Sequence, residues 1–204
     1  QLPRTLQALG HEVRIFLPHS KDLDSVSLGP LEESALLRIR DGQGRTPVTI
    51  RTGYVAGLTI HLIDHEHLFR SRHPYGDESG PYADNWRRFA IFARAVLDGF
   101  GPLAFTPDVI HCFDWTTGLI PLVQKLEYKD RDHPAAKPGT FLAIQNLAMQ
   151  GSFEREILPK IGLPHEYFRA IEGVELGSRV NYLKAGAEFA TLLGAGSPSS
   201  CLLY

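Results

Sequence analysis

Three polar residues follow two short apolar segments, and they are the first candidates for a chemical site. Asp114 comes directly after the segment DVIHCF, and Gln145 and Asn146 come directly after TFLAI. A carboxylate and two amides can hydrogen-bond the hydroxyl groups of a ligand, and a carboxylate can also exchange a proton. If the two segments are neighbouring strands, the three side chains face one crevice at the carboxyl ends of the strands, where α/β folds bind ligands.

Each of these residues also has a purely structural interpretation. Asp114 can equally cap a following helix, although the two threonines after Trp115 can cap it instead. Gln145 and Asn146 can satisfy backbone groups of a loop. Trp115 is expected in the core, because a large aromatic residue after a buried strand usually packs.

A second cluster, HLIDHEH, brings His61, His65 and His67 together with Asp64 and Glu66. Histidines and carboxylates at such spacing can bind a metal ion. However, His61 is expected in a strand and the other residues in a loop, and no further set of ligands is evident. The sequence therefore predicts no metal site, and no cofactor is expected.

Composition narrows the class of protein. The chain has 204 residues, enough for one large or two small domains, with 43% hydrophobic and 22% charged residues. A formal net charge of −2 gives no basic field for nucleic acid or a membrane surface, and no apolar run approaches the ~20 residues that span a bilayer. The two cysteines, Cys112 and Cys201, make a disulfide framework improbable and favour a reducing compartment.

The elements that must position the candidate residues alternate between strand and helix. Apolar periodicity and end signals predict helices over residues 2–10 with Gly10 as the stop, 84–100 with Asp84 as N-cap, 116–127, 154–164 and 179–193. Strands are predicted over residues 12–17, 108–112 and 140–144, and within 36–64, where turns are expected at 41–44, near Gly53 and at Gly57. Residues 19–35 and 64–83 are expected to be loops. This alternation predicts an α/β layered fold with a largely parallel sheet.

Longer segments, taken in order, resemble the bacterial glycogen synthases and plant starch synthases of glycosyltransferase family 5. The resemblance spans nearly the whole chain and is carried by LPRTLQALGHEVRIFLP, LFRSRHPYGDESGPYADNWRRFAIFARAVL, PDVIHCFDWTTGLIP, FLAIQNLAMQGSFEREILPKIGLP and VNYLKAGAEFA. It implies a Rossmann-like domain, the N-terminal half of a glycosyltransferase-B fold. It also implies transfer of glucose from ADP-glucose to an α-1,4-glucan with retention of configuration, without a metal.

The resemblance assigns roles to individual residues. Asp114 falls on the aspartate of the family's HDWH-type motif beside the active site. Asn146, Gln150 and Gly151 fall on the HNLAYQG motif, which lines the donor-sugar pocket. Tyr82 falls on the tyrosine of the Y-x-D-N segment near the site. We therefore expect Asp114 and the residue at position 145 to be catalytic and the other four to bind substrate.

This chain departs from the family at several of these positions. Gln145 replaces a histidine that hydrogen-bonds the donor glucose, and Phe113 and Thr116 replace the two histidines of the HDWH-type motif. Glutamine can hydrogen-bond but cannot titrate, and losing one transition-state contact costs on the order of a hundredfold in rate. The 204 residues contain no match to the family's Lys-x-Gly-Gly loop or to its nucleotide-binding second domain. We therefore expect residues 1–204 to be one incomplete N-terminal domain with an unpaired sheet edge.

Two functions remain open from the sequence. The first is a glucosyltransferase domain, inactive by itself, with the glucan and ADP-glucose as partners. The alternative is a non-catalytic α-glucan-binding or regulatory domain, which the histidine losses favour. A third, unrelated nucleotide-binding α/β domain requires the matched segments to be coincidence. The expected location is the bacterial cytoplasm, or the plastid stroma if the protein is from a plant.

Overall fold

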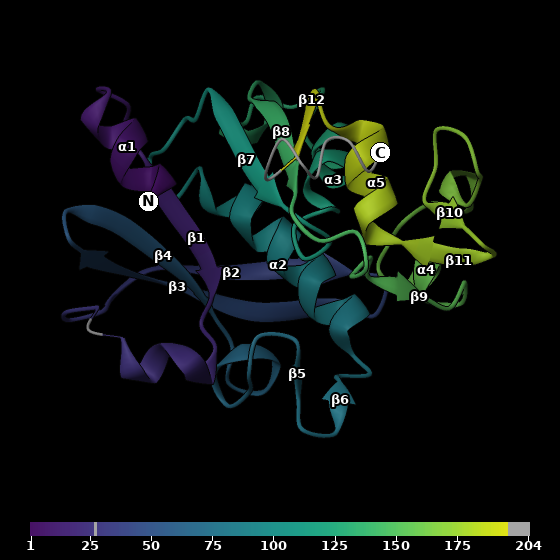
Figure 1. Ribbon diagram of the computed structural model, residues 1–204, viewed down its shortest axis with the longest axis horizontal. Helices are drawn as coiled ribbons and strands as arrows, with labels where there is room; N and C mark the ends of the chain where they lie inside the picture. The colour runs from purple at the N-terminus through teal and green to yellow at the C-terminus, as the bar shows by residue number, and fades with distance from the viewer. Residues whose placement is uncertain (27, 196–204) are drawn as a thin grey trace. The chain divides into compact units, whose positions relative to one another are not determined.

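The computed structural model describes residues 1–26 and 28–195, so Cys201 lies outside the described residues. The chain forms two compact units. Unit 1 comprises residues 1–38 and 47–85, and unit 2 comprises residues 39–46 and everything from residue 86 onward. Each unit has its own sheet (Figure 1).

The sheet of unit 1 has the strand order β1-β4-β3-β2. Its elements are α1 (Leu2–Ala8), β1 (Arg14–Pro18), β2 (Glu32–Asp41), β3 (Gly44–Val55) and β4 (Leu58–Asp64). β1 and β4 are parallel, whereas β3 and β4 form an antiparallel hairpin through the turn at Gly57. Leu28, Ile60 and Leu62 form the buried centre of this unit. η1 (Lys21–Ser25) lies between β1 and β2 in the chain, and η2 (Glu66–Arg70), β5 (Gly76–Asp77) and β6 (Gly80–Pro81) follow β4.

Two predictions for unit 1 are wrong. β2 begins at Glu32, inside the expected loop. Its first residues, Glu32–Ser34, are polar and exposed, so no buried alternating face indicates a strand there. Gly53 is not in a turn but pairs with Ile60 inside the hairpin. A Cβ there would lie 2.7 Å from the Leu31 side chain and 2.9 Å from the Leu28 carbonyl, so the glycine permits a close approach of the chain.

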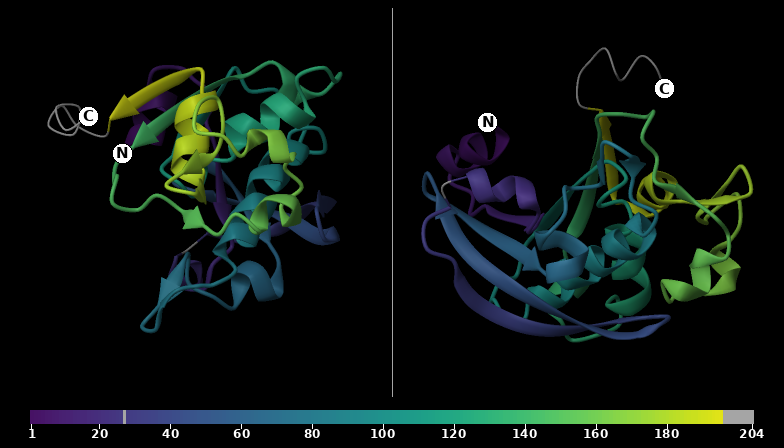
Figure 2. Two further views of the ribbon diagram at one scale, coloured as in Figure 1. Left: turned by 90° about the vertical axis from the view of Figure 1, so that its right-hand side faces the viewer. Right: turned by 90° about the horizontal axis from the view of Figure 1, so that it is seen from below.

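The sheet of unit 2 has the strand order β12-β8-β7, and all its pairings are parallel. Its strands are β7 (Val109–Phe113), β8 (Gly139–Ile144) and β12 (Leu192–Ala195), with the helices α2 (Asn85–Gly99), α3 (Ile120–Glu127) and α5 (Tyr182–Phe189). Ile110, Cys112 and Leu142 point to one face of the sheet and are buried. α3 and α5 lie on the same side of the three strands in Figures 1 and 2.

The rest of unit 2 is made of short elements. These are η3 (Pro134–Ala136), β9 (Ser152–Phe153), α4 (Ile157–Lys160), η4 (His165–Tyr167), β10 (Glu175–Leu176) and β11 (Arg179–Asn181). β9, β10 and β11 form a small antiparallel sheet. The β2–β3 turn belongs to this unit, and the backbone N–H of Gly42 donates to the Lys160 carbonyl at 3.0 Å.

The predicted helices of unit 2 are shorter than expected. The predicted helix at 154–164 keeps only the four residues of α4, where Pro159 limits the backbone hydrogen bonds. The predicted helix at 179–193 is wrong at both ends, because Arg179–Asn181 and Leu192–Ala195 are strands. Leu192–Ala195 pairs with β8, which is a non-local contact that local periodicity cannot indicate.

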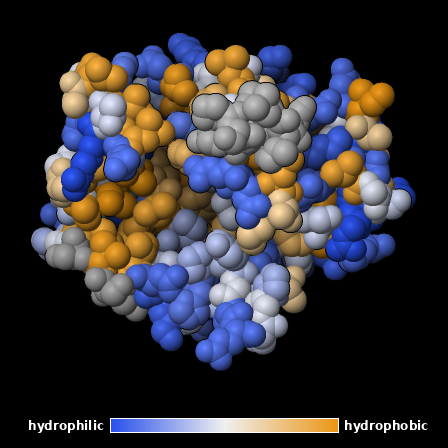
Figure 3. All heavy atoms as spheres, viewed as in Figure 1, coloured by the Kyte–Doolittle hydropathy of each residue, from blue (hydrophilic) through white to orange (hydrophobic). Residues whose placement is uncertain are grey.

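The prediction of an α/β fold with a largely parallel sheet is confirmed. β1 and β7 each lie at the edge of their own sheet. No helix within the described residues is long and apolar enough to cross a membrane. Hydrophobic residues do reach the surface in both units, among them Leu36, Val109 and Leu192, and orange atoms are visible in Figure 3.

Candidate functional site

The turn after β7 places Asp114. Its backbone N–H donates to the Ala143 carbonyl at 3.0 Å, so pairing with β8 continues one residue beyond the strand. Asp114 has φ of 51°, in the left-handed region that aspartate tolerates better than most residues. The Thr117 hydroxyl accepts from the Phe113 N–H at 2.6 Å and donates to the Phe113 carbonyl at 2.8 Å. Asp114 does not cap a helix, since α3 begins only at Ile120.

The Asp114 carboxylate holds the loop after β8. Its Oδ1 accepts from the backbone N–H groups of Gln145 at 2.7 Å and Asn146 at 3.1 Å. The expectation that the two strands are neighbours and bring these three residues together is therefore confirmed. Among the described residues, Oδ2 of Asp114 has no hydrogen-bond partner, which leaves it available to a ligand.

The loop that Asp114 holds presents two amide side chains. Gln145 and Asn146 are exposed. Asn146 accepts from the Ala148 N–H at 3.0 Å through Oδ1, a local turn that leaves its Nδ2 group outside the contact. The side-chain amide of Gln145 makes no hydrogen bond within the described part of the chain. These neutral amides are suited to the hydroxyl groups of a ligand.

Gly151 closes the same loop against the indole of Trp115. It has φ of 61°, and a Cβ there would lie 2.4 Å from the Trp115 ring. Trp115 is 6% exposed and meets Phe89 edge-to-face at 4.8 Å between ring centroids. The prediction that Trp115 belongs to the core is confirmed, and the indole is the wall that fixes the course of the loop.

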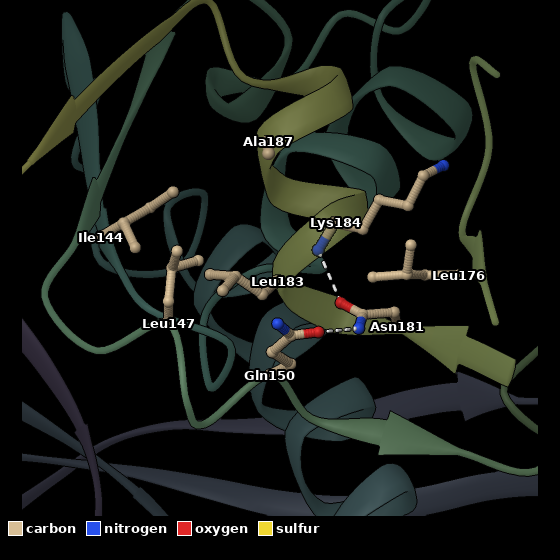
Figure 4. Close-up of a pocket in the computed structure, with 8 residues that line it drawn as sticks. All are labelled: Ile144, Leu147, Gln150, Leu176, Asn181, Leu183, Lys184 and Ala187. Atoms are coloured by element: carbon tan, nitrogen blue, oxygen red, sulfur yellow. Dashed lines mark hydrogen bonds between the residues drawn. The ribbon is translucent and has the colours of Figure 1, made fainter. Parts of the chain in front are cut away.

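Gln150 lies beside a small pocket, shown in Figure 4. The pocket has a volume of about 130 Å³ and is lined by Ile144, Leu147, Gln150, Leu176, Asn181, Leu183, Lys184 and Ala187. The Gln150 Oε1 accepts from Asn181 Nδ2 at 2.8 Å. Sequence reasoning missed Asn181, although an asparagine directly before an apolar helical segment is an N-cap signal.

Tyr82 belongs to unit 1, where Arg72 and His73 contact it. The Arg72 guanidinium lies 4.0 Å from the centroid of the Tyr82 ring, and the His73 N–H donates to the Tyr82 hydroxyl at 3.3 Å. Arg72 also donates to both oxygens of Asp84, at 2.7 and 2.9 Å. Asp84, predicted as an N-cap, precedes α2 and uses its carboxylate to hold the arginine that covers Tyr82.

Two other titratable groups lie within β7, where Cys112 is buried and His111 is half-buried. Burial raises the pKa of the Cys112 thiol to about 12, so it is not a nucleophile at neutral pH. Burial also lowers the pKa of His111, which stacks on Phe113 at 4.3 Å between ring centroids. Within residues 1–26 and 28–195, no group of three or more histidine, cysteine or carboxylate residues is placed to hold a metal ion.

Taken together, the ends of β7 and β8 gather one carboxylate and three amides from Asp114, Gln145, Asn146 and Gln150. These side chains can donate and accept hydrogen bonds to many hydroxyl groups of a ligand, and the carboxylate gives them a single negative charge. It is suited to holding a carbohydrate rather than to metal or thiol chemistry.

Comparison with known proteins identifies the family of the chain. The profile of the starch synthase catalytic domain family matches residues 1–201. The glycogen synthase of Myxococcus xanthus is 36% identical over 200 residues, which cover 97% of this chain and 41% of that protein. The glycogen synthase of Geotalea uraniireducens is 37% identical over 201 residues, or 98% and 41% of the two chains.

A solved structure shares the fold. The catalytic domain of starch synthase IV from Arabidopsis thaliana, bound to ADP and acarbose, matches with a TM-score of 0.81 and 26% identity. The match covers 94% of this chain and 39% of that one. The chain thus spans about two fifths of the length of the proteins that it resembles.

Proposed function

The chain belongs to the starch synthase catalytic domain family, and we propose from this premise that it is part of a retaining glucosyltransferase. The proposed reaction transfers glucose from ADP-glucose to an α-1,4-glucan. The ADP in the Arabidopsis structure supports a nucleotide donor. The bacterial relatives favour the bacterial cytoplasm over the plastid stroma as the proposed location.

The observation that carries this proposal is the contact between Asp114 and the loop after β8. One carboxylate oxygen fixes two consecutive backbone N–H groups, so the side chains of Gln145 and Asn146 are presented from a rigid base. A site that must discriminate a transition state from a substrate needs such preorganisation. We assign the free oxygen of Asp114 and the Gln145 amide to the reacting end of the sugar.

The other assigned residues bind substrate. Asn146, Gln150 and Gly151 form the wall of the donor-sugar pocket, with Gly151 bringing the backbone close to Trp115. Tyr82, whose ring lies against the Arg72 guanidinium, is also assigned to substrate binding. Because the chain spans 41% of its relatives, we propose that residues 1–204 are an N-terminal domain and that a second domain completes the nucleotide site.

The proposal is tested by titrating the 204-residue chain with maltoheptaose in a calorimeter. We expect binding that weakens about tenfold in Asn146→Ala, the effect of losing one hydrogen bond to a ligand. Gln43→Ala is the matched control, because Gln43 is an exposed amide in the β2–β3 turn. A folded chain that binds no glucan, or a control that weakens binding equally, would contradict the proposal.

A second assay addresses the transfer itself. We expect no incorporation of labelled glucose from ADP-glucose into glycogen by this chain alone, since the donor site is proposed to need a second domain. Clear turnover by the 204 residues would show that the proposed division of the site between two domains is wrong.

The alternative is a non-catalytic α-glucan-binding domain, and Gln145 is the observation that favours it. This position carries a histidine in the family that the chain resembles, and a glutamine cannot carry a positive charge. The variant Gln145→His in the full-length protein separates the two functions. Activity that appears only in the variant supports the binding domain, whereas activity with Gln145 supports the transferase.

A further inference from the structure

Asn181 is fixed by the helix that it begins. It is the N-cap of α5, it is 2% exposed, and its Oδ1 accepts from the Lys184 N–H at 2.8 Å. A backbone N–H can only donate, so the oxygen of the Asn181 amide must face the helix. The nitrogen, Nδ2, therefore faces the other way, toward Gln150.

The orientation of the Asn181 side-chain amide also sets the orientation of the Gln150 side-chain amide. Asn181 Nδ2 donates to Gln150 Oε1 at 2.8 Å, and the Leu183 N–H donates to the Gln150 carbonyl at 3.0 Å. The first turn of α5 thus holds both the backbone and the side chain of Gln150. Because Oε1 is engaged, the Nε2 group of Gln150 is the end that remains outside the contact (Figure 4).

The pocket beside Gln150 offers few protein groups that could accept a hydrogen bond from Nε2. Its walls are apolar at Ile144, Leu147, Leu176, Leu183 and Ala187. The ammonium group of Lys184 donates to the Gly173 carbonyl at 2.6 Å and points away from Gln150 in Figure 4. Within the described residues, Nε2 of Gln150 has no hydrogen-bond partner. An apolar pocket with one oriented donor selects a ligand oxygen that accepts a hydrogen bond.

We propose that Asn181 is a positioning residue that sets the polarity of the Gln150 amide, so that the pocket recognises an acceptor oxygen of a sugar hydroxyl. The inference rests on the proposed function, because it takes the ligand to be a carbohydrate. Asn181 touches no substrate itself and acts through Gln150.

The variant Asn181→Asp separates this role from helix capping. Aspartate caps a helix as well as asparagine does, so the melting temperature is expected to stay within about 2 °C. The new carboxylate can only accept, which forces the Gln150 amide to turn and donate its Nε2 group inward. The pocket then meets a carbonyl oxygen in place of an N–H donor.

Two readouts test the inference on the 204-residue chain. In Asn181→Asp, we expect the side-chain NH2 signals of Gln150 in ¹⁵N–¹H NMR spectra to shift, and maltoheptaose binding to weaken about tenfold. Gln150→Glu keeps the acceptor for Asn181 but removes the outward donor, and a similar loss is expected. Asn181→Ser keeps the cap and releases Gln150, so a smaller loss of about threefold is expected.

The outcomes are distinguishable. Unchanged Gln150 signals in Asn181→Asp would overturn the positioning role, whether or not glucan binds. Shifted signals with unchanged maltoheptaose affinity would overturn the recognition of a hydroxyl oxygen. A wild-type chain that is folded but binds no maltoheptaose would overturn the proposed function together with the sugar part of this inference.

Discussion

Each unit has an aspartate at the end of one of its strands, and the two carboxylates have opposite surroundings. Asp64 ends β4 in unit 1, is 1% exposed in its side chain, and accepts from Arg51 Nε at 2.6 Å and Arg70 Nε at 2.9 Å. Asp114 follows β7 in unit 2 and, within the part of the chain that the structure describes, accepts only from backbone N–H groups through one oxygen.

The difference shows what makes a carboxylate available for chemistry. Burial alone would raise the pKa of Asp64, but hydrogen bonds from Arg70 and Arg51 outweigh it and lower the pKa. Both carboxylate oxygens of Asp64 accept from arginines, and His19 Nδ1 lies 3.3 Å from Oδ1, so this carboxylate stabilises unit 1. Asp114 keeps one oxygen outside its contacts and organises a loop of amides. Residue type and place at a strand end do not distinguish the two, whereas their partners do.

The largest expected effect is at the β7 and β8 ends. In Gly151→Ala, the new methyl group would meet the Trp115 ring and the backbone would stay at positive φ, so unfolding free energy should fall by about 4 kcal/mol. Gly57→Ala is the control, since Gly57 has φ of 80° with nothing within 4 Å of a Cβ, and should cost about 1 kcal/mol. Urea denaturation measures both, and equal losses would contradict the role of the indole wall.

The next effect tests the β4 end. Asp64→Asn removes the charge that Arg51 and Arg70 share and directs an NH2 group at their donors, so unfolding free energy should fall by about 3 kcal/mol. Glu66→Gln is the matched control, because Glu66 is 56% exposed and pairs with the same Arg70 at 3.3 Å. It should change stability by less than about 0.5 kcal/mol. A weaker effect of Asp64→Asn than of Glu66→Gln would reverse the comparison.

The stability of unit 1 is also expected to depend on pH, because it buries a titratable histidine. Burial, aided by the positive charge of Arg14, lowers the pKa of His61 from 6.5 to about 4. Between pH 4 and pH 6.5 the His61 imidazole is protonated in the unfolded chain but neutral in the folded chain. The contribution of His61 to stability is therefore fully present above pH 6.5 and is lost as the pH falls toward 4. The expected loss is roughly 2–3 kcal/mol.

His61→Phe should remove that slope. His61 packs against Phe16 at 4.8 Å between ring centroids, and its Nδ1 shares a hydrogen bond of 2.9 Å with the Thr52 hydroxyl. A phenylalanine ring keeps the packing but loses this hydrogen bond, and the Ser34 hydroxyl, 2.6 Å from Thr52 Oγ1, remains as a partner for Thr52. His11→Gln, at an exposed position, is the control. Denaturation curves at pH 7, 5.5 and 4.5 measure the slope, and an unchanged slope in His61→Phe would assign the pH dependence to other groups.

The smallest expected effect is at Asp114 itself. Asparagine can accept the same two N–H groups and tolerates positive φ, so Asp114→Asn should lose only about 1 kcal/mol from weaker, uncharged hydrogen bonds. Amide exchange of Gln145 and Asn146 should quicken while that of unit 1 does not change. A loss as large as that of Gly151→Ala would mean that the charge of Asp114 stabilises the fold rather than serving a ligand.

Part of the site was predictable from the sequence because its signals are local. The apolar segments before Asp114 and Gln145 indicated two strands, and their pairing confirmed that the residues meet. Asn181 was not predictable as a partner of Gln150, because 31 residues separate them and only the folded position of α5 joins them. The same holds for Leu192–Ala195, whose strand form depends on β8.

The most direct test of the account compares the two strand ends in one experiment. Backbone amide signals of the 204-residue chain are followed by NMR during titration with maltoheptaose. We predict shifts at the residues around Asp114, Gln145, Asn146 and Gln150, with Asp64 and Arg70 unaffected. Shifts confined to the end of β4 would contradict the assignment of the carbohydrate site to β7 and β8.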